Sequence, residues 1–355
     1  MDFAESAPPG PGPSDGDVLG ALALIARDAV HGGGACRCGA DEVRVLADRE
    51  DGAVVRHAGL VAKAHAPGTE AGPHAARLAL AGRPELGGIL LPPVPGPRPE
   101  RVAGRPVTVW PYGPPVDPED PDAAPWEEAA RLLALLHRTP PPSGAAGRLP
   151  AMRAPAKAAL AVARMLDAAP AHPAAATVLA AWRTVTETGT GTETGTGTET
   201  GTGPAAETGA LAASGASPDS GAPRAYLCHG DFHLGQLVRD FRGDWLLIDV
   251  DDAGLGDPAW DLARPAAWFA AGLLPGEAWS RFLGAYEAAG GPATGADPWT
   301  RLDRPARALT VQTAALALAK STAERRGLDE VEDVMIDTCA RIASARTASG
   351  STASP

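Results

Sequence analysis

With 355 residues, the chain is long enough to bury one large core or two smaller ones, so a two-lobed enzyme is an ordinary expectation. Its four cysteines are too few and too irregularly spaced for a disulfide framework, which fits a reducing cytosol. The net charge of -12 argues against a broad nucleic-acid-binding surface, because such a surface needs a basic field; the acidity favours solubility and would also suit a cationic small substrate.

The sequence also lacks the signals of membrane proteins and secreted proteins. No apolar run approaches the length of a membrane span. The acidic start MDFAESAPPGPGPSDGD has no basic segment before an apolar one, as a signal peptide would have. We therefore expect a cytoplasmic protein with no membrane partner and no nucleic-acid partner.

Two residue types are scarce enough for their positions to be informative. Lysine stands only at Lys63, Lys157 and Lys320, among 31 lysines and arginines. Arginine cannot always replace a compact ammonium group, so each lysine is a candidate for a specific role. The segment Cys36-Arg37-Cys38 is a CxC pair with no second pair, a pattern that favours ordinary thiols over a zinc site.

The N-terminal part predicts a helix followed by a small antiparallel sheet. Residues 1–15 are rich in proline and glycine and are expected to be disordered, and Asp15 or Asp17 can cap a helix through Val30. The glycine-rich turn HGGGACRCG is interpreted as a flexible connection. Three strands are then predicted, because apolar and polar residues alternate between turns that contain Asp-Gly and Ala-Gly, over residues 42–49, 53–57 and 60–66.

The third predicted strand carries Lys63 on the same face as Val61 and His65, because side chains alternate with a period of two. A lysine in the middle of a strand is costly to cover without an anionic partner; the alternative is an edge-strand lysine that faces water. Thr69 can cap a helix to Ala81, or Pro73 can begin it. A further strand is predicted over residues 105–113, ending in Trp-Pro-Tyr.

The C-terminal part is predicted to be mostly helical. Residues 125–138 have proline at the start, acidic residues in the first turn and a regular apolar face, and residues 151–183 continue the helical pattern. The sequence TETGTG then occurs three times in succession, and residues 186–222 are interpreted as a disordered low-complexity insertion. Further helices follow to about residue 346, and residues 347–355 are predicted to be a disordered tail.

Residues 226–263 carry the chemistry. The triplet His229-Gly230-Asp231 is followed after five positions by the amide of Gln236, and a second carboxylate, Asp249, ends an apolar run. A predicted hairpin places both aspartates near its open end. A catalytic-loop aspartate, an amide five residues later and a second aspartate after one more strand are the spacing of a phosphoryl-transfer site.

This segment resembles the aminoglycoside phosphotransferase and choline-kinase-like family, which has an HGDxxxxN loop followed by an Ile-Asp metal motif. The resemblance is strongest over residues 226–263 and extends over residues 40–340. It implies an α+β, protein-kinase-like two-lobed fold. A small N-terminal nucleotide-binding lobe with an antiparallel sheet would span residues 16–112, and a larger, mostly helical C-terminal lobe for catalysis and substrate binding would span residues 113–346.

The resemblance also assigns roles. Asp231 matches the catalytic base that accepts the proton of the substrate hydroxyl, and Asp249 matches the aspartate that holds Mg2+. Gln236 stands where the family usually has asparagine, and both amides can present a carbonyl oxygen to a hard cation. Lys63 matches the lysine that reaches the α- and β-phosphates of ATP, and Glu70 is the candidate helix carboxylate that holds it, or else it serves the helix dipole.

The segment Trp110-Pro111-Tyr112 fits a hinge between the lobes, where adenine would pair with backbone groups. Because Pro111 has no N–H, the expected partners are the Trp110 carbonyl and the Tyr112 amide. The alternative is an apolar strand end that a turn closes.

Several polar residues near the motif are expected to be architectural. His137 is interpreted as a packed residue at a helix end, and His233 as a loop-packing residue. Asp257 is expected to cap the next helix and Asp261 to brace the catalytic loop; the alternative for both is a role as substrate ligands. Of the neighbours of Asp249, one is a candidate second metal ligand and the other a solvated strand end; these residues are Asp251 and Asp252.

The sequence therefore predicts an ATP-dependent phosphotransferase that uses ATP and Mg2+ and acts on a hydroxyl of a small molecule, aminoglycoside-like or an amino alcohol. An alternative is a sugar kinase, because the HLGQ segment of the loop resembles that of bacterial maltokinases. A second alternative is a non-catalytic nucleotide-binding module, suggested by Gln236 and by the weak candidate Glu70.

Overall fold

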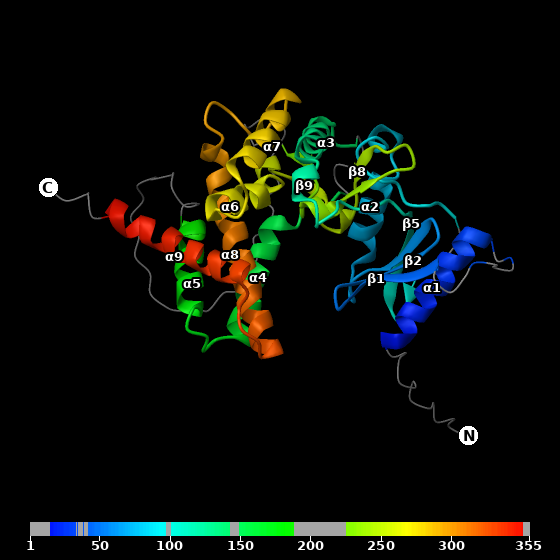
Figure 1. Cartoon of the computed structure of the whole chain (residues 1–355), viewed down its shortest axis with the longest axis horizontal. Helices are drawn as coiled ribbons and strands as arrows, with labels where there is room; N and C mark the ends of the chain where they lie inside the picture. The colour runs from blue at the N-terminus through cyan, green and yellow to red at the C-terminus, as the bar shows by residue number, and fades with distance from the viewer. Residues whose placement is uncertain are drawn as a thin grey trace, which may run out of the picture.

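The computed structural model describes residues 15–32, 34, 38, 42–96, 101–142, 149–187 and 225–350. The expectations for residues 1–14, for residues 188–222 of the insertion and for the last five residues of the tail lie outside this described part. Two parts follow each other along the chain, a sheet with helices at the N-terminal end and a larger group of helices at the C-terminal end (Figure 1).

The N-terminal part is a five-stranded antiparallel sheet in the order β1-β2-β3-β5-β4. The three predicted strands and the later strand are confirmed, and a short strand joins them at one edge: β1 Val43–Arg49, β2 Gly52–His57, β3 Leu60–Ala64, β4 Arg101–Val102 and β5 Arg105–Pro111. The turn between β2 and β3 places Ala58 in the left-handed region, at φ 49°. In the β3–β5 register, Lys63 lies opposite Thr108 and Val61 opposite Trp110.

Two helices flank this sheet. Helix α1 (Asp15–His31) packs on it through Val18, Leu22 and Ala26, which share a core with Val55 of β2 and other inward residues. Alternate residues of β2 are buried, as expected for a strand with one face covered. Helix α2 (Ala71–Ala81) begins after Glu70, and Thr69 instead closes the preceding turn by donating to the Ala66 carbonyl. Thr69 is therefore not the helix cap.

The region between the two lobes contains α3 (Trp126–Arg138) and two short antiparallel strand pairs. Strand β6 (Tyr226–Cys228) pairs with β9 (Gly254–Gly256), and β7 (Leu237–Arg239) pairs with β8 (Trp245–Leu247). The helix and the β7–β8 hairpin were predicted. The returning strand is shorter than expected, because residues 250–252 form a turn of 3-10 helix.

The C-terminal part is helical, as predicted. Its helices are α4 (Ala154–Ala168), α5 (Ala175–Glu187), α6 (Ala263–Ala271), α7 (Gly276–Ala288), α8 (Trp299–Glu324) and α9 (Glu330–Gly350). A core of small and branched apolar side chains joins α4, α5, α8 and α9. Helix α9 continues into the segment that we expected to be a disordered tail.

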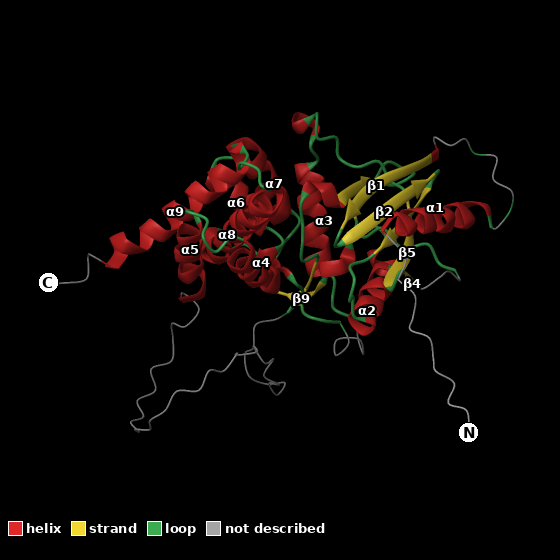
Figure 2. Cartoon of the chain, turned by 90° about the horizontal axis from the view of Figure 1, so that it is seen from below, coloured by secondary structure: helices red, strands yellow, loops and turns green. Residues whose placement is uncertain are grey.

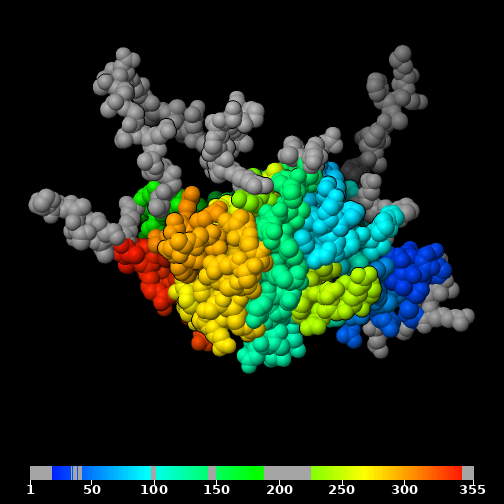
Figure 3. Space-filling model, turned by 90° about the horizontal axis from the view of Figure 1, so that it is seen from above, coloured from blue at the N-terminus to red at the C-terminus, as the bar shows by residue number. Residues whose placement is uncertain are grey.

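Figure 2 shows the sheet and the helical group at opposite ends, with α3 between them. In the space-filling view the same order runs from blue through green to yellow and red (Figure 3). The largest core crosses this middle region, because it includes Leu90, Trp110, Leu133, Leu247 and Phe282. None of the described helices is both long and apolar enough to span a membrane.

Candidate active site

The β7–β8 hairpin brings the predicted amide and the second aspartate to the same end. The Ile248 amide donates to the Gln236 carbonyl at 2.9 Å, so the backbone pairing continues up to the residue before Asp249. Asp249 has φ 62°, in the left-handed region, where the chain leaves the strand. Gln236 is buried, with 9% of its surface exposed.

Lys63 reaches this end of the hairpin from the sheet. Its Nζ lies 2.7 Å from Asp249 Oδ1 and 2.9 Å from Asp251 Oδ2. Burial would lower the pKa of Lys63, but the two carboxylates raise it above the ordinary value, so the ammonium stays charged. Lys63 is thus a half-buried, paired lysine on an inner strand and not an edge-strand residue that faces water.

Asp251 has a second partner on the sheet. Its Oδ2 lies 2.8 Å from His65 Nδ1, and His65 Nε2 lies 2.7 Å from Thr108 Oγ1. Burial would raise the pKa of Asp251, but its contacts with His65 and Lys63 hold it far below the usual range. Asp251 is therefore a cross-lobe anchor.

Glu70 does not take the position that sequence reasoning gave it. It is exposed at the N-terminal cap of α2, and within the described residues Lys63 forms no ion pair with it. The carboxylate beside Lys63 and Asp249 belongs to Asp251, which follows Asp249 in the same turn. The expectation that Glu70 holds Lys63 is wrong for this structure, because the short turn after β8 brings a carboxylate closer.

The loop that carries Asp231 is fixed from below by Asp261. The two oxygens of Asp261 accept the His229 amide at 2.6 Å and the Gly230 amide at 2.7 Å. Gly230 has φ +83°, and a Cβ there would clash with the Asp252 carbonyl oxygen, so the loop needs glycine. Asp261 also contacts His137 Nε2 at 2.9 Å, and the other ring nitrogen of His137 contacts the Tyr286 hydroxyl at 2.7 Å.

These contacts confirm the architectural interpretations. Asp261 braces the loop, and His137 is a buried residue at the end of α3. Asp257 accepts the Ala259 amide as a cap and pairs with Arg301 at 2.6 Å. His233 packs in the loop, where its ring accepts the Gly235 amide and burial, followed by the charge of Arg264, lowers its pKa to about 4.

Asp231 lies between two cations that come from helices. Lys157 Nζ of α4 is 2.8 Å from Asp231 Oδ2, and Arg264 Nη2 of α6 is 2.8 Å from Asp231 Oδ1. Burial alone would raise the pKa of Asp231, but the charges of Lys157 and Arg264 outweigh it and lower the pKa to about 2. The carboxylate is therefore ionised throughout the physiological range.

Lys157 is shared with a second carboxylate. It lies 2.6 Å from Asp252 Oδ2, and Arg153 lies 3.2 Å from the other oxygen of Asp252. Asp252 is buried, and Asp251 is held by Lys63 and His65. Neither neighbour of Asp249 is therefore the solvated strand end that we expected. Neither Lys157 nor Arg264 was predicted as a site residue. The scarcity of lysine in the sequence could have pointed to Lys157, whereas no feature of the sequence distinguished Arg264 from the other arginines.

A small pocket opens beside these groups. It is lined by Lys157, Asp231 and Arg264 together with the apolar Trp260 and Leu309, and by Gln312 of α8. Among the buried polar atoms that lack a hydrogen-bond partner in the described part of the chain, two belong to pocket-lining side chains: Arg264 Nε and Gln312 Oε1. Unpaired buried donors and acceptors are costly, so their presence at a pocket indicates a polar ligand.

At the end of β5, the backbone groups that we expected to pair with adenine are engaged within the sheet. The Tyr112 amide already donates to the Gly59 carbonyl at 2.8 Å. Antiparallel pairing alternates, so Trp110 also directs its backbone groups at Val61, its partner in β3. The Trp110 carbonyl and the Tyr112 amide are thus used inside the sheet, and the expectation that they face a ligand is wrong.

The other edge of the same strand faces away from β3. The Val109 carbonyl points there and accepts the Val94 amide at 2.9 Å. By the same alternation the Pro111 carbonyl points to that side. The next amide that points to this side belongs to Gly113. Gly113 lies close to β7, since a Cβ there would clash with the Arg239 carbonyl oxygen.

The sequence profile of the phosphotransferase enzyme family matches residues 40–304, which is more than half of the chain. This range includes Lys63, Asp231 and Asp249. A search of curated proteins gave no match.

Solved structures resemble the whole fold at low sequence identity. The chain is similar to a macrolide 2'-phosphotransferase type I, with 19% identity, 90% of this chain and 100% of that chain covered, and a TM-score of 0.51. It is also similar to the choline kinase LicA from Streptococcus pneumoniae, with 11% identity, coverage of 92% and 99%, and a TM-score of 0.55. A third similar structure is a thermostable mutant of an aminoglycoside phosphotransferase, solved as a ternary complex with AMP-PNP and hygromycin B, with 11% identity, coverage of 90% and 98%, and a TM-score of 0.54. These likenesses confirm the protein-kinase-like fold.

Proposed function

The chain belongs to the phosphotransferase enzyme family and is a small-molecule kinase, and we propose that it moves the γ-phosphate of ATP to a hydroxyl group of its acceptor. One observation carries this proposal: Lys63 of the sheet meets Asp249 of the hairpin at 2.7 Å. The pair joins a cation suited to phosphate with a carboxylate suited to a metal ion. Asp231 belongs to the same segment, in a loop braced by Asp261.

In this proposal Asp231 orients the acceptor hydroxyl and takes its proton. Phosphoryl transfer needs an in-line nucleophile and neutralised charge more than covalent help from the protein. Lys63 binds the phosphates of the nucleotide. Lys157 and Arg264 keep Asp231 ionised and add positive charge at the point where the transferred group passes.

The donor set fits Mg2+. Hard oxygen ligands suit this ion, and the Asp249 carboxylate and the Gln236 amide lie at the same end of one hairpin. When bound, the ion would neutralise charge on the phosphate oxygens. Asp249 would exchange its contact with Lys63 for the ion, while Asp251 still holds Lys63 at 2.9 Å.

The adenine ring of ATP is proposed to pair with the Pro111 carbonyl and the Gly113 amide. These groups replace the Trp110 carbonyl and the Tyr112 amide, which the sheet uses. The buried Trp110 side chain, whose indole donates to Thr108 Oγ1 at 2.8 Å, would support this strand end from within the core.

The acceptor pocket favours an uncharged hydroxylated molecule. An aminoglycoside-like acceptor or an amino alcohol carries ammonium groups, which need carboxylate partners. Asp231 is the one carboxylate among the residues that line the described pocket, and both of its oxygens already contact cations. The unpartnered Arg264 Nε donor and Gln312 Oε1 acceptor match hydroxyl groups, which donate and accept. This observation favours the sugar-kinase alternative for the acceptor.

An acceptor panel tests this proposal. Transfer of labelled γ-phosphate from ATP is measured with neutral sugars and polyols, amino alcohols and aminoglycosides, and Asp231→Asn is the control for each acceptor. Turnover with neutral hydroxylated molecules and none with cationic ones is the expected result. Transfer confined to aminoglycosides would refute the acceptor assignment, and ATP binding without transfer or hydrolysis under any condition would favour the non-catalytic alternative.

A further inference from the structure

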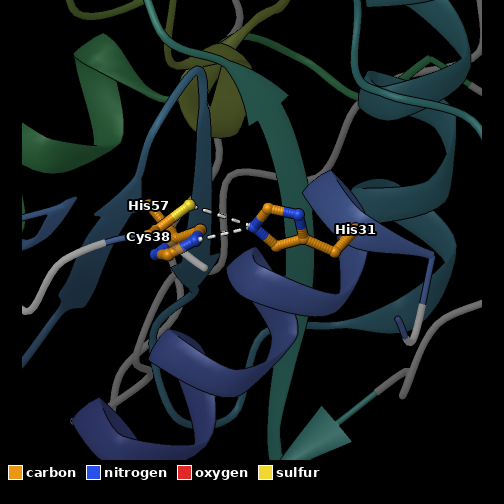
Figure 4. Close-up of side chains that lie close together, drawn as sticks. All are labelled: His31, Cys38 and His57. Atoms are coloured by element: carbon orange, nitrogen blue, oxygen red, sulfur yellow. Dashed lines mark hydrogen bonds between the residues drawn. The ribbon is translucent and has the colours of Figure 1, made fainter. Parts of the chain in front are cut away.

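A cluster of three metal-binding side chains lies in the N-terminal lobe, away from the phosphotransfer residues. His31 is the last residue of α1, Cys38 lies in the connection that follows, and His57 is the last residue of β2. Figure 4 shows the two rings and the sulfur converging. His31 Nε2 lies 3.2 Å from His57 Nε2 and 3.3 Å from Cys38 Sγ, and the three ligand atoms all lie within 4.8 Å of one another.

We propose that His31, Cys38 and His57 bind a zinc ion. In a tetrahedral site with Zn–N of about 2.05 Å and Zn–S of about 2.3 Å, two nitrogens are roughly 3.3 Å apart, and a nitrogen and a sulfur are roughly 3.6 Å apart. The observed separations of 3.2 Å and 3.3 Å are close to these values. Two imidazoles and one thiolate form a borderline-soft set that suits zinc and disfavours magnesium or calcium.

Hydrogen bonding alone accounts less well for this geometry. His31 Nε2 has a single position in the ring plane for either a proton or a lone pair, yet it faces both His57 Nε2 and Cys38 Sγ at hydrogen-bond distance. One metal ion in the space between the three atoms satisfies all of them at once. His57 is 2% exposed, whereas His31 and Cys38 are half-buried, so the ion would be anchored from within and reached from the surface.

The site would give the connection after α1 a structural function. This connection, which the sequence predicts to be flexible, would be fixed to both the end of α1 and the end of β2. The sequence of the CxC pair alone favours ordinary thiols, because no second pair is present. The ligands that complete the site are histidines from a helix end and a strand end, positions that only the fold brings together.

Zinc binding is tested on the full chain by metal analysis and by competition with a chromophoric chelator. One equivalent of zinc per chain is expected, and cobalt substitution should give the thiolate-to-cobalt charge-transfer absorption. Replacing a ligand should weaken zinc binding by more than about 100-fold, since loss of an outer partner alone costs about 10- to 100-fold. His31→Gln and Cys38→Ser are the test variants because both side chains are half-buried.

Matched controls come from the helical lobe. His172→Gln and Cys339→Ala should keep the zinc affinity of the natural protein. Cys36, which lies outside the described residues, is replaced by serine in a parallel series, in which zinc should still bind and still depend on His31 and Cys38. A stoichiometry near zero, no cobalt–thiolate absorption, or equal affinities in the natural protein and the His31→Gln variant would overturn the proposal.

Discussion

Lys63 Nζ lies 2.7 Å from Asp249 Oδ1, although the two residues are 186 positions apart, so the sheet and the end of the β7–β8 hairpin meet through an ion pair. The first prediction removes the charge with Lys63→Met. We expect kcat/KM for ATP to fall by about two to three orders of magnitude, because the nucleotide phosphates lose their positioned cation. Steady-state kinetics measure this fall. Lys320→Met, at an exposed position of α8, is the matched control and should keep normal kinetics.

The second prediction concerns Asp231. Asp231→Asn keeps the size of the side chain but removes the base, so turnover should fall by about two to four orders of magnitude. The measurement is kcat with saturating ATP, accompanied by a thermal melt to show that the variant is folded. Asp244→Asn, on the exposed turn between β7 and β8, should leave kcat unchanged. Near-normal turnover of Asp231→Asn would remove this residue from the mechanism.

The third prediction follows from the cations beside Asp231. With a pKa of about 2, Asp231 contributes no acidic limb to the pH–rate profile of the natural enzyme above about pH 4. In Lys157→Met the main cause of the low pKa is lost while burial, which raises the pKa, remains. The acidic limb that Asp231 contributes to the pH profile of kcat/KM should therefore lie at higher pH in the variant than in the natural enzyme. A profile that stays in place after this substitution would show that Lys157 does not control the ionisation of Asp231.

The fourth prediction concerns the stability of the catalytic loop. Asp261→Ala leaves the His229 and Gly230 amides and buried His137 without their carboxylate, so the free energy of unfolding should fall by about 3–5 kcal/mol. Burial raises the pKa of Asp261, but its contacts with His137 and the backbone lower it below the ordinary value. The stabilisation is then complete above the unfolded pKa of about 3.9 and is lost as the pH falls through the folded pKa.

Urea denaturation at several pH values checks both parts of the fourth prediction. The stability difference between the natural protein and Asp261→Ala should be constant at neutral pH and shrink in acid. A difference that grows as the pH falls would contradict the sign of the shift. Asp167→Ala, at an exposed position of α4, serves as a control for general effects of losing an acid.

The fifth prediction concerns the amide. Gln236→Asn retains a carbonyl oxygen at the same end of the hairpin, so activity should persist with an altered dependence on the Mg2+ concentration. Gln236→Leu, of similar size but without the oxygen, should raise the required Mg2+ concentration much further. Titrations of activity against Mg2+ measure both. Identical curves for all three proteins would exclude Gln236 as a ligand.

Local patterns predicted the hairpin that carries the motif, because Asp231, Gln236 and Asp249 are held by chain connections of a few residues and one turn. Lys157 and Arg264 reach Asp231 from 74 and 33 positions away, through helix packing that periodicity does not specify. Asp251 takes the place expected for Glu70, since the turn after β8 curls its side chain back to Lys63. The backbone groups that are available at the hinge depend on which residues of β5 direct their N–H and C=O toward β3. A register shift of one residue reverses this choice, and the sequence does not specify it.

The claim that this chain transfers phosphate through Asp231 is tested most directly by following the γ-phosphate itself. The natural enzyme and Asp231→Asn are incubated with labelled ATP, Mg2+ and the acceptor panel, and the label is located in ATP, free phosphate or a phosphorylated acceptor. We predict acceptor-bound label with the natural enzyme and a rate about two to four orders of magnitude lower with Asp231→Asn, while nucleotide binding is retained. Equal transfer by both proteins, or label that never leaves ATP with the natural enzyme, would contradict the account.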